Sequence, residues 1–307
     1  MMKNIISVVG PTASGKTALS VGLAKAFNGE IVSVDSMQIY RGMDIGTAKI
    51  THEEQQGIVH HMIDCLEPYE NCNVQKFVSM ARSAVDDIVN RGKICVLAGG
   101  TGLYVDHLIS DTKFVDIPTD LDLRRELSIK QDEELLSMLA SKDPDSYERL
   151  HINDKKRIVR ALEIVLLTGK TIGYWDSLSH LSSNPLDAVM IGLNYIDRAQ
   201  LYERIDRRVD KMIEDGLVSE VSDLLTIDGF ERSTASAAIG YKEIISYLKN
   251  DISLDEAIAL IKLNTRHYAK RQLTWFKRNK KISWIDVSAD ATNEVILEQA
   301  IQIVNRS

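Results

Sequence analysis

Residues 5–17 read IISVVGPTASGKT, a short apolar run that passes directly into a glycine-rich loop. The β-branched run Ile5–Val9 predicts a buried strand, and the residues KTALSVGLAKAF that end the loop and follow it predict a helix. Between them, Gly10–Thr17 matches G-x-x-x-x-G-K-[ST], the pattern of a loop that holds phosphates. Its amides face the anion, Lys16 adds a charge, and the Thr17 hydroxyl can bind Mg²⁺. The candidate phosphate-binding residues are therefore Gly10, Pro11, Thr12, Ala13, Ser14, Gly15, Lys16 and Thr17.

Composition restricts the class of protein. A chain of 307 residues with 44% hydrophobic and 26% charged residues predicts an ordinary globular protein of roughly two domains. The net charge of −7 excludes a generally basic nucleic-acid coat, so binding an anionic polymer would need a local basic patch.

Cys65, Cys72 and Cys95 lack C-x-x-C spacing and indicate a reducing compartment. No apolar run is long enough for a membrane span, and we expect no membrane contact and a cytoplasmic protein.

The rest of the chain predicts an α/β fold: a P-loop core with a mainly parallel sheet flanked by helices. Further strands are expected in EIVSVD, KICVLAGGTG and DAVMIGLNYI, with a helix capped by Asn73 in VQKFVSMARSAVDDIVNRG. Residues 117–185 show charged helical periods and no clear strand, which predicts an all-helical insertion into a core of residues 1–116 and 186–307. Long helices follow, one of them beginning at a capping box near Ser253.

Asp35 and Thr101 each follow a predicted strand, so both are expected at the sheet edge that carries the glycine loop. Asp35 has three readings at this stage. It could bind Mg²⁺, act as a general base towards a nucleophile, or serve as a turn or helix-capping carboxylate.

Several longer blocks then resemble one known family. They are DSMQIYRGMDIGTAK (35–49), HHMID (60–64), AGGTGLY (98–104), RIVRALE (157–163), AIGYKE (238–243) and KRQLTWFKR (270–278). Together with GPTASGKT, these blocks closely resemble the tRNA dimethylallyltransferases, also called tRNA isopentenyltransferases, from about residue 5 to residue 278. The chain looks like a bacterial-type member, because it lacks the zinc-finger extension of eukaryotic relatives.

The resemblance implies a reaction. The family transfers a dimethylallyl group from dimethylallyl diphosphate to N6 of the adenosine beside the anticodon, position 37, in tRNAs that read codons beginning with U. The products are N6-(dimethylallyl)adenosine and diphosphate. By resemblance, the glycine loop and Arg208 hold the donor's diphosphate with Mg²⁺ on Thr17, Thr101 lies at the transfer centre, and Asp35 is the general base. From the residues alone, Arg208 could also be a solvated helix charge, and Thr101 could cap the next helix.

The resemblance also implies a surface for the tRNA anticodon stem-loop, with Gln38 at the adenine edge. The implied contacts are Asp35, Ser36, Met37, Gln38, Thr101, Arg124, Lys156, Arg157, Ile158, Val159, Arg160, Ala237, Ala238, Ile239, Gly240, Tyr241, Lys242, Lys270, Arg271, Gln272, Leu273, Thr274, Trp275, Phe276 and Lys277.

Charge patterning favours part of the same surface. No Asp or Glu occurs between Ala257 and Ile285, whereas Arg266, Lys270 and Lys277 fall on one helix face, with Tyr268, Trp275 and Phe276 interleaved. A solvated face over a core of these aromatics explains the charges equally well.

Two other functions remain open from the residues alone. A P-loop kinase or NTPase would use Asp35 as a Mg²⁺ ligand, and a nucleotide-gated RNA-binding module would need no chemistry. A zinc site at His60, His61, Cys65 and Cys72 has no standard spacing, so we expect the two histidines to support Asp35. Family precedent implies a monomer.

Overall fold

The computed structural model describes residues 3–179, 185–288 and 291–307. Its contacts divide the chain into two compact units, which we call the core unit (Met1–Ile109 with Leu186–Ser307) and the inserted unit (Ser110–Pro185). The sequence had placed the start of the insertion at residue 117 and its end at 185. Within the described ranges, no helix combines the length and the apolar composition that a bilayer span needs.

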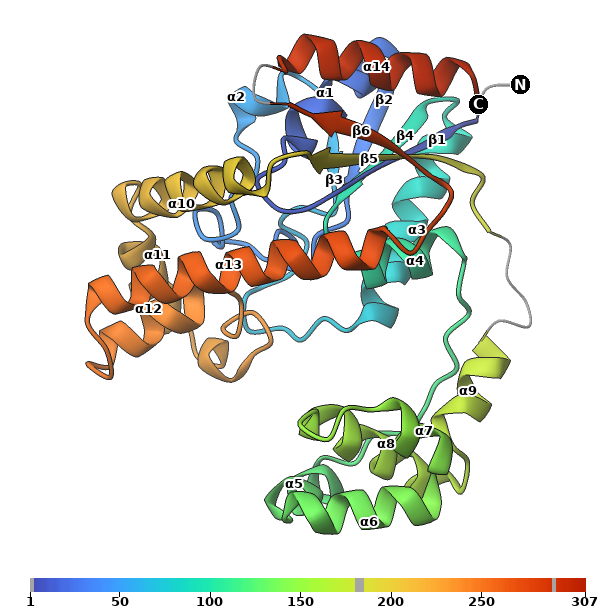
Figure 1. The fold of residues 1–307 in the computed structure, drawn as a ribbon, viewed down its shortest axis with the longest axis vertical. Helices are drawn as coiled ribbons and strands as arrows, with labels where there is room; N and C mark the ends of the chain where they lie inside the picture. The colour runs from blue at the N-terminus through green and yellow to red at the C-terminus, as the bar shows by residue number, and fades with distance from the viewer. Residues whose placement is uncertain (1–2, 180–184, 289–290) are drawn as a thin grey trace. The chain divides into compact units, whose positions relative to one another are not determined.

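The core unit is built on a sheet in which, over the described residues, six strands pair in parallel (Figure 1). From one edge to the other they are β3 (His60–His61), β2 (Gly29–Ser33), β4 (Ile94–Gly99), β1 (Ile5–Val9), β5 (Ala188–Tyr195) and β6 (Ile282–Val287). Every residue of β1 and β2 is buried, because helices cover both faces of a parallel sheet. The predicted α/β fold with a parallel sheet is confirmed. The two edge strands, β3 and β6, were not predicted.

The register of the strands brings the functional loops together. Val9 of β1 lies beside Gly99 of β4, so these two strands end at the same level, and the neighbouring β5 runs on from Gly192 to Tyr195. The chain leaving β2 stays attached to β4 through the bond from the Val34 amide to the Ala98 carbonyl, 2.8 Å long. The glycine loop, the residues after β2 and the turn after β4 therefore share one edge of the sheet, where ligands of such sheets bind.

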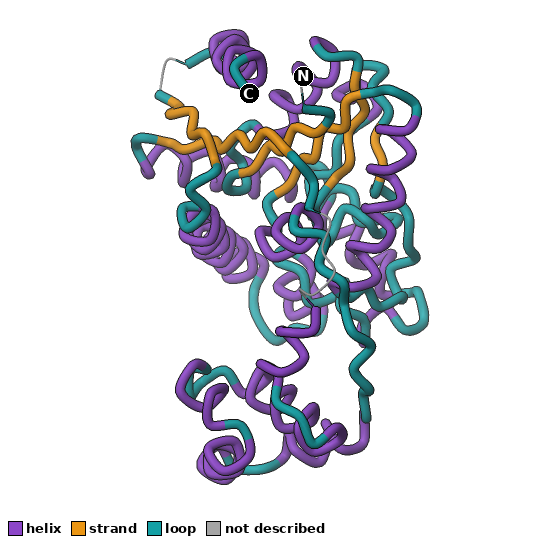
Figure 2. Tube along the Cα trace, turned by 90° about the vertical axis from the view of Figure 1, so that its right-hand side faces the viewer, coloured by secondary structure: helices purple, strands orange, loops and turns teal. Residues whose placement is uncertain are grey.

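Helices cover both faces of the sheet (Figures 1 and 2). One face carries α1 (Lys16–Ala26) and α14 (Asn293–Asn305), which pack against each other. The other face carries α3 (Val74–Asn90), with α4 (Gly102–Ile109) against it. The Asn73 side chain accepts the Lys76 amide at 2.8 Å, so the predicted cap of α3 is confirmed.

A second group of helices completes the core unit beside the carboxyl edge of the sheet. The longest, α13 (Leu254–Phe276), begins at Ser253 with the predicted capping box and packs along α10 (Arg198–Glu214) and α12 (Tyr241–Leu248) (Figure 1). The remaining helices are α2 (His52–Gln55), α11 (Leu217–Leu225) and the short 3₁₀ helix η1 (Phe230–Arg232).

All regular secondary structure among the described residues of the inserted unit is helical, as the sequence predicted. It consists of α5 (Leu121–Ile129), α6 (Asp132–Lys142), α7 (Pro144–Arg149), α8 (Lys155–Thr168) and α9 (Ile172–Ser179). A small core of its own holds these helices together, with Leu127, Leu139 and Leu162 at its centre.

Candidate active site

The phosphate loop between β1 and α1 is bent by three residues with positive φ: Gly10 (149°), Ala13 (60°) and Gly15 (91°). The amides of Ala13, Ser14 and Gly15 make no hydrogen bond with the described chain, and the Ser14 hydroxyl oxygen is buried there without a partner. Unpaired donors of this kind cost free energy until a ligand satisfies them. The loop is therefore preformed for an anion, in the strand–loop–helix context that the sequence predicted.

Three cationic side chains bind the loop from different directions. Lys16 Nζ donates to the Pro11 carbonyl oxygen at 2.6 Å, and Arg204 Nε donates to the Ala13 carbonyl oxygen at 2.9 Å. Arg208 Nη1 donates to Thr12 Oγ1 at 3.3 Å. The reading of Arg208 as a solvated helix charge is therefore wrong, since this side chain reaches the phosphate loop from α10.

Positive charge is concentrated where it is poorly solvated. Burial lowers the pKa of Lys16 to about 7, with the Arg208 charge acting in the same direction and the Asp35 carboxylate opposing it. Burial also lowers the pKa of Arg208, again opposed by Asp35. A multiply charged anion beside Lys16 and Arg208 would relieve both effects. The electrostatics therefore favour an anionic ligand at this loop.

Asp35 follows β2 and faces these cations. Its Oδ1 accepts the amides of Met37 at 2.9 Å and Gln38 at 3.4 Å, which makes it a turn carboxylate, one of the three readings from the sequence. No hydrogen bond from the described chain reaches Oδ2. The turn thus holds one carboxylate oxygen in place and leaves the other available to a ligand.

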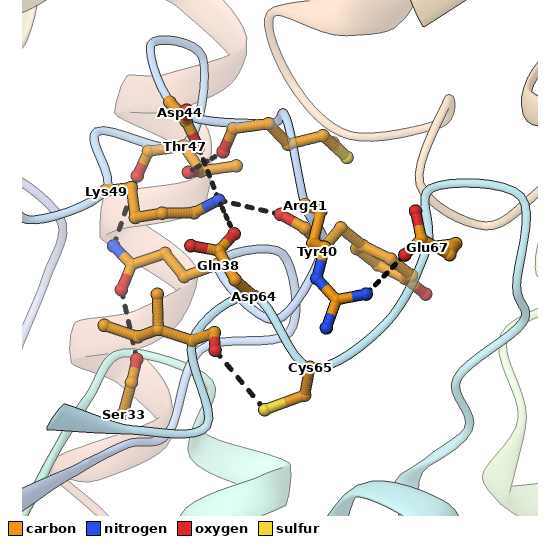
Figure 3. A network of polar contacts seen from close by, with 12 residues as sticks. Ser33, Gln38, Tyr40, Arg41, Asp44, Thr47, Lys49, Asp64, Cys65 and Glu67 are labelled. Carbon is orange, nitrogen blue, oxygen red and sulfur yellow. Dashed lines mark hydrogen bonds and ion pairs between the residues drawn. The ribbon is translucent and has the colours of Figure 1, made fainter. Parts of the chain in front are cut away.

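The chain after Asp35 is held by an internal polar network (Figure 3). Gln38 Oε1 accepts the Ser33 hydroxyl at 3.0 Å, and its Nε2 donates to the carbonyl oxygens of Thr47 and Ala48, both at 3.3 Å. Lys49 Nζ donates to the Tyr40 carbonyl oxygen and pairs with Asp44 and Asp64 at 2.5 and 2.6 Å. The Gln38 amide is therefore already bonded to protein, and a contact with an adenine edge has to compete with these bonds. Ser36 and Met37 are half-buried beside it.

Thr101 lies at the start of α4, in the turn after β4. Its carbonyl oxygen accepts the amides of Tyr104 and Val105. Its Oγ1 is buried beside the Tyr268 phenol, and a hydrogen bond between these two side chains opposes the rise in the pKa of that phenol. The hydroxyl therefore does not cap the helix, which was the alternative reading of this residue. It faces a side chain that lines the cleft instead.

One cleft brings most of the predicted site together. It is lined by Thr12, Ala13, Ser14, Gly15, Lys16 and Thr17, and by Asp35, Gln38 and Arg208. Gly10 and Pro11 are buried and do not line the cleft, and Thr101 follows the cleft residue Gly100. The cleft is also lined by His60, Tyr268 and Gln272, which the sequence analysis had not placed there.

The basic residues of α13 fall into two groups. Lys270, Arg271 and Lys277 are exposed, and so is Thr274 among them, whereas Leu273 is half-buried. Arg266 and its neighbour Lys262 are instead paired with carboxylates of α10: Arg266 with Asp206 at 2.6 Å, and Lys262 with Asp210 at 2.5 Å. The predicted stripe is therefore shorter than expected, because α10 neutralises its first part.

The aromatic residues of α13 also separate. The Arg278 guanidinium stacks over the Trp275 ring at 4.1 Å, Phe276 is fully buried, and Tyr268 lines the cleft. Burial raises the pKa of the Tyr268 phenol, and the nearby Asp35 carboxylate adds to this rise. The expectation of several aromatic surfaces for RNA bases is corrected for Phe276, which is a core residue.

Only part of the segment 237–242 is available at the surface. Ala237 and Lys242 are exposed and Ile239 is half-buried, but Ala238, Gly240 and Tyr241 are buried. The Tyr241 hydroxyl donates to Glu220 Oε1 at 2.6 Å, and Glu220 also accepts the amides of Asp44, Ile45 and Gly46. Tyr241 thus supports the chain that carries Gln38, which corrects its expected side-chain contact with RNA.

The predicted RNA contacts of the inserted unit differ in how exposed their side chains are. Lys156 and Arg157 are exposed, whereas Ile158 and Val159 are core residues, so their side chains are not offered to a ligand. Arg124 and Arg160 both bond the fully buried Glu163, at 2.8 and 2.7 Å. These two arginines have a structural role, and parts of both guanidinium groups also remain exposed.

Comparison with known proteins identifies the family. The sequence profile described as IPP transferase matches residues 38–279. The tRNA dimethylallyltransferase of Caldanaerobacter subterraneus subsp. tengcongensis is 46% identical over 98% of both chains, and that of Thermoanaerobacter sp. is 48% identical over 94% of this chain and 93% of the relative. The chain belongs to the IPP transferase family.

Solved structures of this family agree over the whole chain. The full-length tRNA isopentenylpyrophosphate transferase of Bacillus halodurans is 42% identical, with a TM-score of 0.73, covering 100% of this chain and 98% of the other. A eukaryotic dimethylallyltransferase acting on tRNA is 30% identical, with a TM-score of 0.82, over 99% of this chain and 79% of that one. The resemblance stated from sequence blocks is confirmed.

The predicted Mg²⁺ site can be tested against the donors that this IPP transferase offers. Thr17 is exposed at the first turn of α1 and lines the cleft. The described residues contain no cluster of three or more His, Cys, Asp or Glu side chains that could hold a metal ion. Mg²⁺ commonly takes few protein ligands and binds mainly to water and substrate phosphates. The Thr17 hydroxyl therefore fits an ion that arrives with a diphosphate.

The histidine pair plays two separate roles. His61 Nε2 lies 2.7 Å from Oε2 of the buried Glu30, which also binds Arg91 and Lys93. The expected support of Asp35 is thus wrong for His61. His60 bonds the Ile58 carbonyl oxygen through Nδ1 and lines the cleft.

Sequence reasoning missed Tyr268 and Gln272 as residues of the cleft, although it had named both. They lie four residues apart on α13, so they share one helical face, and this face is distinct from the one that carries Lys270 and Lys277. Separating the two faces of α13 in the sequence would have found them.

Proposed function

We propose that this chain transfers the dimethylallyl group of dimethylallyl diphosphate to N6 of the adenosine beside the anticodon of tRNA, releasing diphosphate. One observation carries the proposal: a single cleft combines a phosphate loop, half-buried Lys16 and Arg208, and an opposed carboxylate, Asp35. The names of the close relatives and the tRNA-acting structural neighbour support it.

The phosphate loop stabilises the leaving group. As the bond between allylic carbon and oxygen breaks, negative charge grows on the diphosphate and positive charge spreads over the allyl fragment. The free amides of residues 13–15, together with Lys16 and Arg208, lie where they can stabilise the departing diphosphate more than the intact donor. Mg²⁺ held at Thr17 would supply further positive charge to the diphosphate oxygens.

Asp35 acts on the acceptor. The N6 amine is a weak nucleophile, because its lone pair is delocalised into the purine. When N6 forms its bond to the allylic carbon it must lose one proton, and Asp35 Oδ2 is free to accept it while Oδ1 remains bonded to Met37 and Gln38. Each turnover thus forms one carbon–nitrogen bond, breaks one carbon–oxygen bond and moves one proton to Asp35.

The acceptor base has to leave its stack to reach this cleft. The exposed cations of α13, Lys270, Arg271 and Lys277, offer contacts to the RNA backbone near the cleft residues of the same helix. Thr101 adds a buried hydroxyl beside Tyr268, which lines the same cleft. We propose a monomer as the working unit.

The proposal is tested by incubating the purified protein with Mg²⁺, labelled dimethylallyl diphosphate and unmodified tRNA carrying adenosine beside the anticodon. We expect label in the RNA, on N6 of that adenosine after nuclease digestion. ATP consumption without label transfer would instead support a kinase or NTPase, and tRNA binding with neither would support an RNA-binding module. Either result contradicts the proposal.

A further inference from the structure

Gln272 joins two parts of the active site that are far apart in the sequence. Its side chain comes from α13 and is only 6% exposed. Its Oε1 accepts the amide of Thr12 in the phosphate loop at 2.8 Å, and its Nε2 donates to the carbonyl oxygen of Gly100, in the turn that leads to Thr101, at 2.9 Å. One side chain therefore spans from the phosphate loop to the turn after β4.

The turn after β4 packs so closely against α13 that a side chain larger than that of glycine has no room at Gly100 or Gly102. A Cβ atom on Gly100 would lie 2.2 Å from Gln272 Nε2, and a Cβ atom on Gly102 would lie 2.3 Å from Cδ1 of Trp275. Trp275 Nε1 also donates to Asp106 Oδ2 in α4 at 2.7 Å. The two glycines on either side of Thr101 thus admit α13 at close range, and Gln272 and Trp275 hold it there.

The chemistry of the link requires a side chain with both a donor and an acceptor. Thr12 presents a donor and Gly100 presents an acceptor, so the linking side chain must accept at one end and donate at the other. A neutral glutamine does both, whereas an apolar side chain leaves a buried N–H and a buried C=O unpaired, and an ionised glutamate repels the carbonyl oxygen.

The bond between the Thr12 amide and Gln272 also determines which loop amides remain free to bind a diphosphate. Pro11 has no N–H, and the Thr12 amide is occupied by Gln272, so neither can donate to a diphosphate. The amides of Ala13, Ser14 and Gly15, and those of Lys16 and Thr17 at the first turn of α1, are left as donors. Holding the Thr12 amide fixes the segment from which these donors project.

We propose that Gln272 is a positioning residue: it sets the phosphate loop against the Thr101 turn so that both face one diphosphate. The inference rests on the proposed function and deepens it. It also replaces the role of RNA contact that the resemblance implied for Gln272, because the side chain faces the cleft and its amide is bonded within the protein.

The first test compares Gln272→Met with Gln299→Met, the same change at an exposed glutamine of α14. We expect Gln272→Met to raise the KM for dimethylallyl diphosphate and the Kd for inorganic diphosphate by about tenfold, because the loop amides lose their alignment. The Kd for tRNA should change less than about twofold, and Gln299→Met should match the wild type. A loss of tRNA affinity with unchanged diphosphate binding would make Gln272 an RNA contact and overturn the proposal.

The second test uses Gln272→Glu and does not depend on the stability of the Met variant. A protonated carboxyl group has one donor and one acceptor, as the amide does, and burial opposite a carbonyl oxygen raises its pKa above the ordinary value. The kcat/KM of Gln272→Glu relative to wild type should therefore rise as the pH falls from 8 to 6. A ratio that does not change with pH would contradict the role.

Failure of the inference and failure of the proposed function give different results. If the wild type transfers no label to tRNA, the proposed function fails, whereas diphosphate binding by the Gln272 variants still tests the link. If the wild type transfers label and Gln272→Met binds diphosphate and turns over like the wild type, the inference alone fails.

Discussion

The protonation state of Lys16 depends directly on whether an anionic ligand is bound. Burial and the nearby Arg208 charge bring its pKa to about 7, so near neutral pH only about half of the free protein carries this charge. A bound diphosphate favours the protonated amine, which means that the ligand is bound together with a proton whenever the pH exceeds this pKa.

We therefore expect the affinity for dimethylallyl diphosphate to fall as the pH rises through this range. If only the protonated lysine binds, the apparent Kd increases about fivefold from pH 7 to pH 8 and changes little on this account below pH 6. Calorimetric titrations in buffers of different ionisation enthalpy measure both the Kd and the proton uptake. Lys16→Met should bind more weakly and lose this component of the pH dependence. An equal slope in both proteins would contradict the assignment.

At the residue scale, the motif and the resemblance predicted the loop, Asp35 and Arg208, and all of them meet in one cleft. The bond from the Thr12 amide to Gln272 was not predictable, because it joins residues that are 260 positions apart. Local patterns report the chemistry of a segment, but they do not report which distant side chain occupies a given amide.

At the scale of the element, α13 is a helix with two functions. One face carries the exposed cations Lys270 and Lys277, and another carries Tyr268 and Gln272 into the cleft. The sequence predicted the cations but overestimated their number, since Asp206 of α10 neutralises Arg266. Carboxylates from another helix are invisible to a count of charges along one segment.

Salt dependence separates the two groups of cations. Lys270→Ala should weaken tRNA binding and reduce the slope of log Kd against log salt by about one, as expected for the loss of one phosphate contact. Arg266→Ala is the matched comparison and should change the slope much less, because Arg266 is already paired. Fluorescence titrations from low to moderate salt measure both slopes. An unchanged slope for Lys270→Ala would count against this face of α13 as an RNA surface.

At the scale of the whole molecule, the parallel sheet and the helical insertion were predictable from alternating strand and helix patterns. The edge strands β3 and β6 were not: β3 has only two residues, and β6 follows a basic run that looked helical. Edge strands pair on one side only, so their sequences are less strongly constrained.

The inserted unit has its own core and its own buried charge. Glu163 is fully buried and binds Arg124 and Arg160, whose side chains are 40% and 33% exposed. Glu163→Gln should destabilise this unit by about 1–3 kcal/mol, at the modest end for buried pairs because both arginines keep part of their hydration.

Hydrogen exchange measures the loss of stability in Glu163→Gln separately for the inserted unit and for the core unit. Protection of α5 and α8 should fall in Glu163→Gln, while the Kd of the core unit for inorganic diphosphate stays the same. Glu134→Gln, which removes an exposed pair with Lys130, should leave protection within about 0.5 kcal/mol of wild type. Equal protection in both variants would show that the Glu163 pairs contribute little.

The central claim is that Asp35 takes the proton from an adenosine amine while a diphosphate leaves from the glycine loop. Single-turnover transfer of labelled dimethylallyl to tRNA by Asp35→Asn tests it most directly, since asparagine keeps the Oδ1 acceptor that holds the Met37 amide. We expect a rate of bond formation about 10²–10⁴ lower, with the Kd values for tRNA and donor within about twofold of wild type. A rate within tenfold of wild type, or a loss explained by weaker tRNA binding, would contradict it.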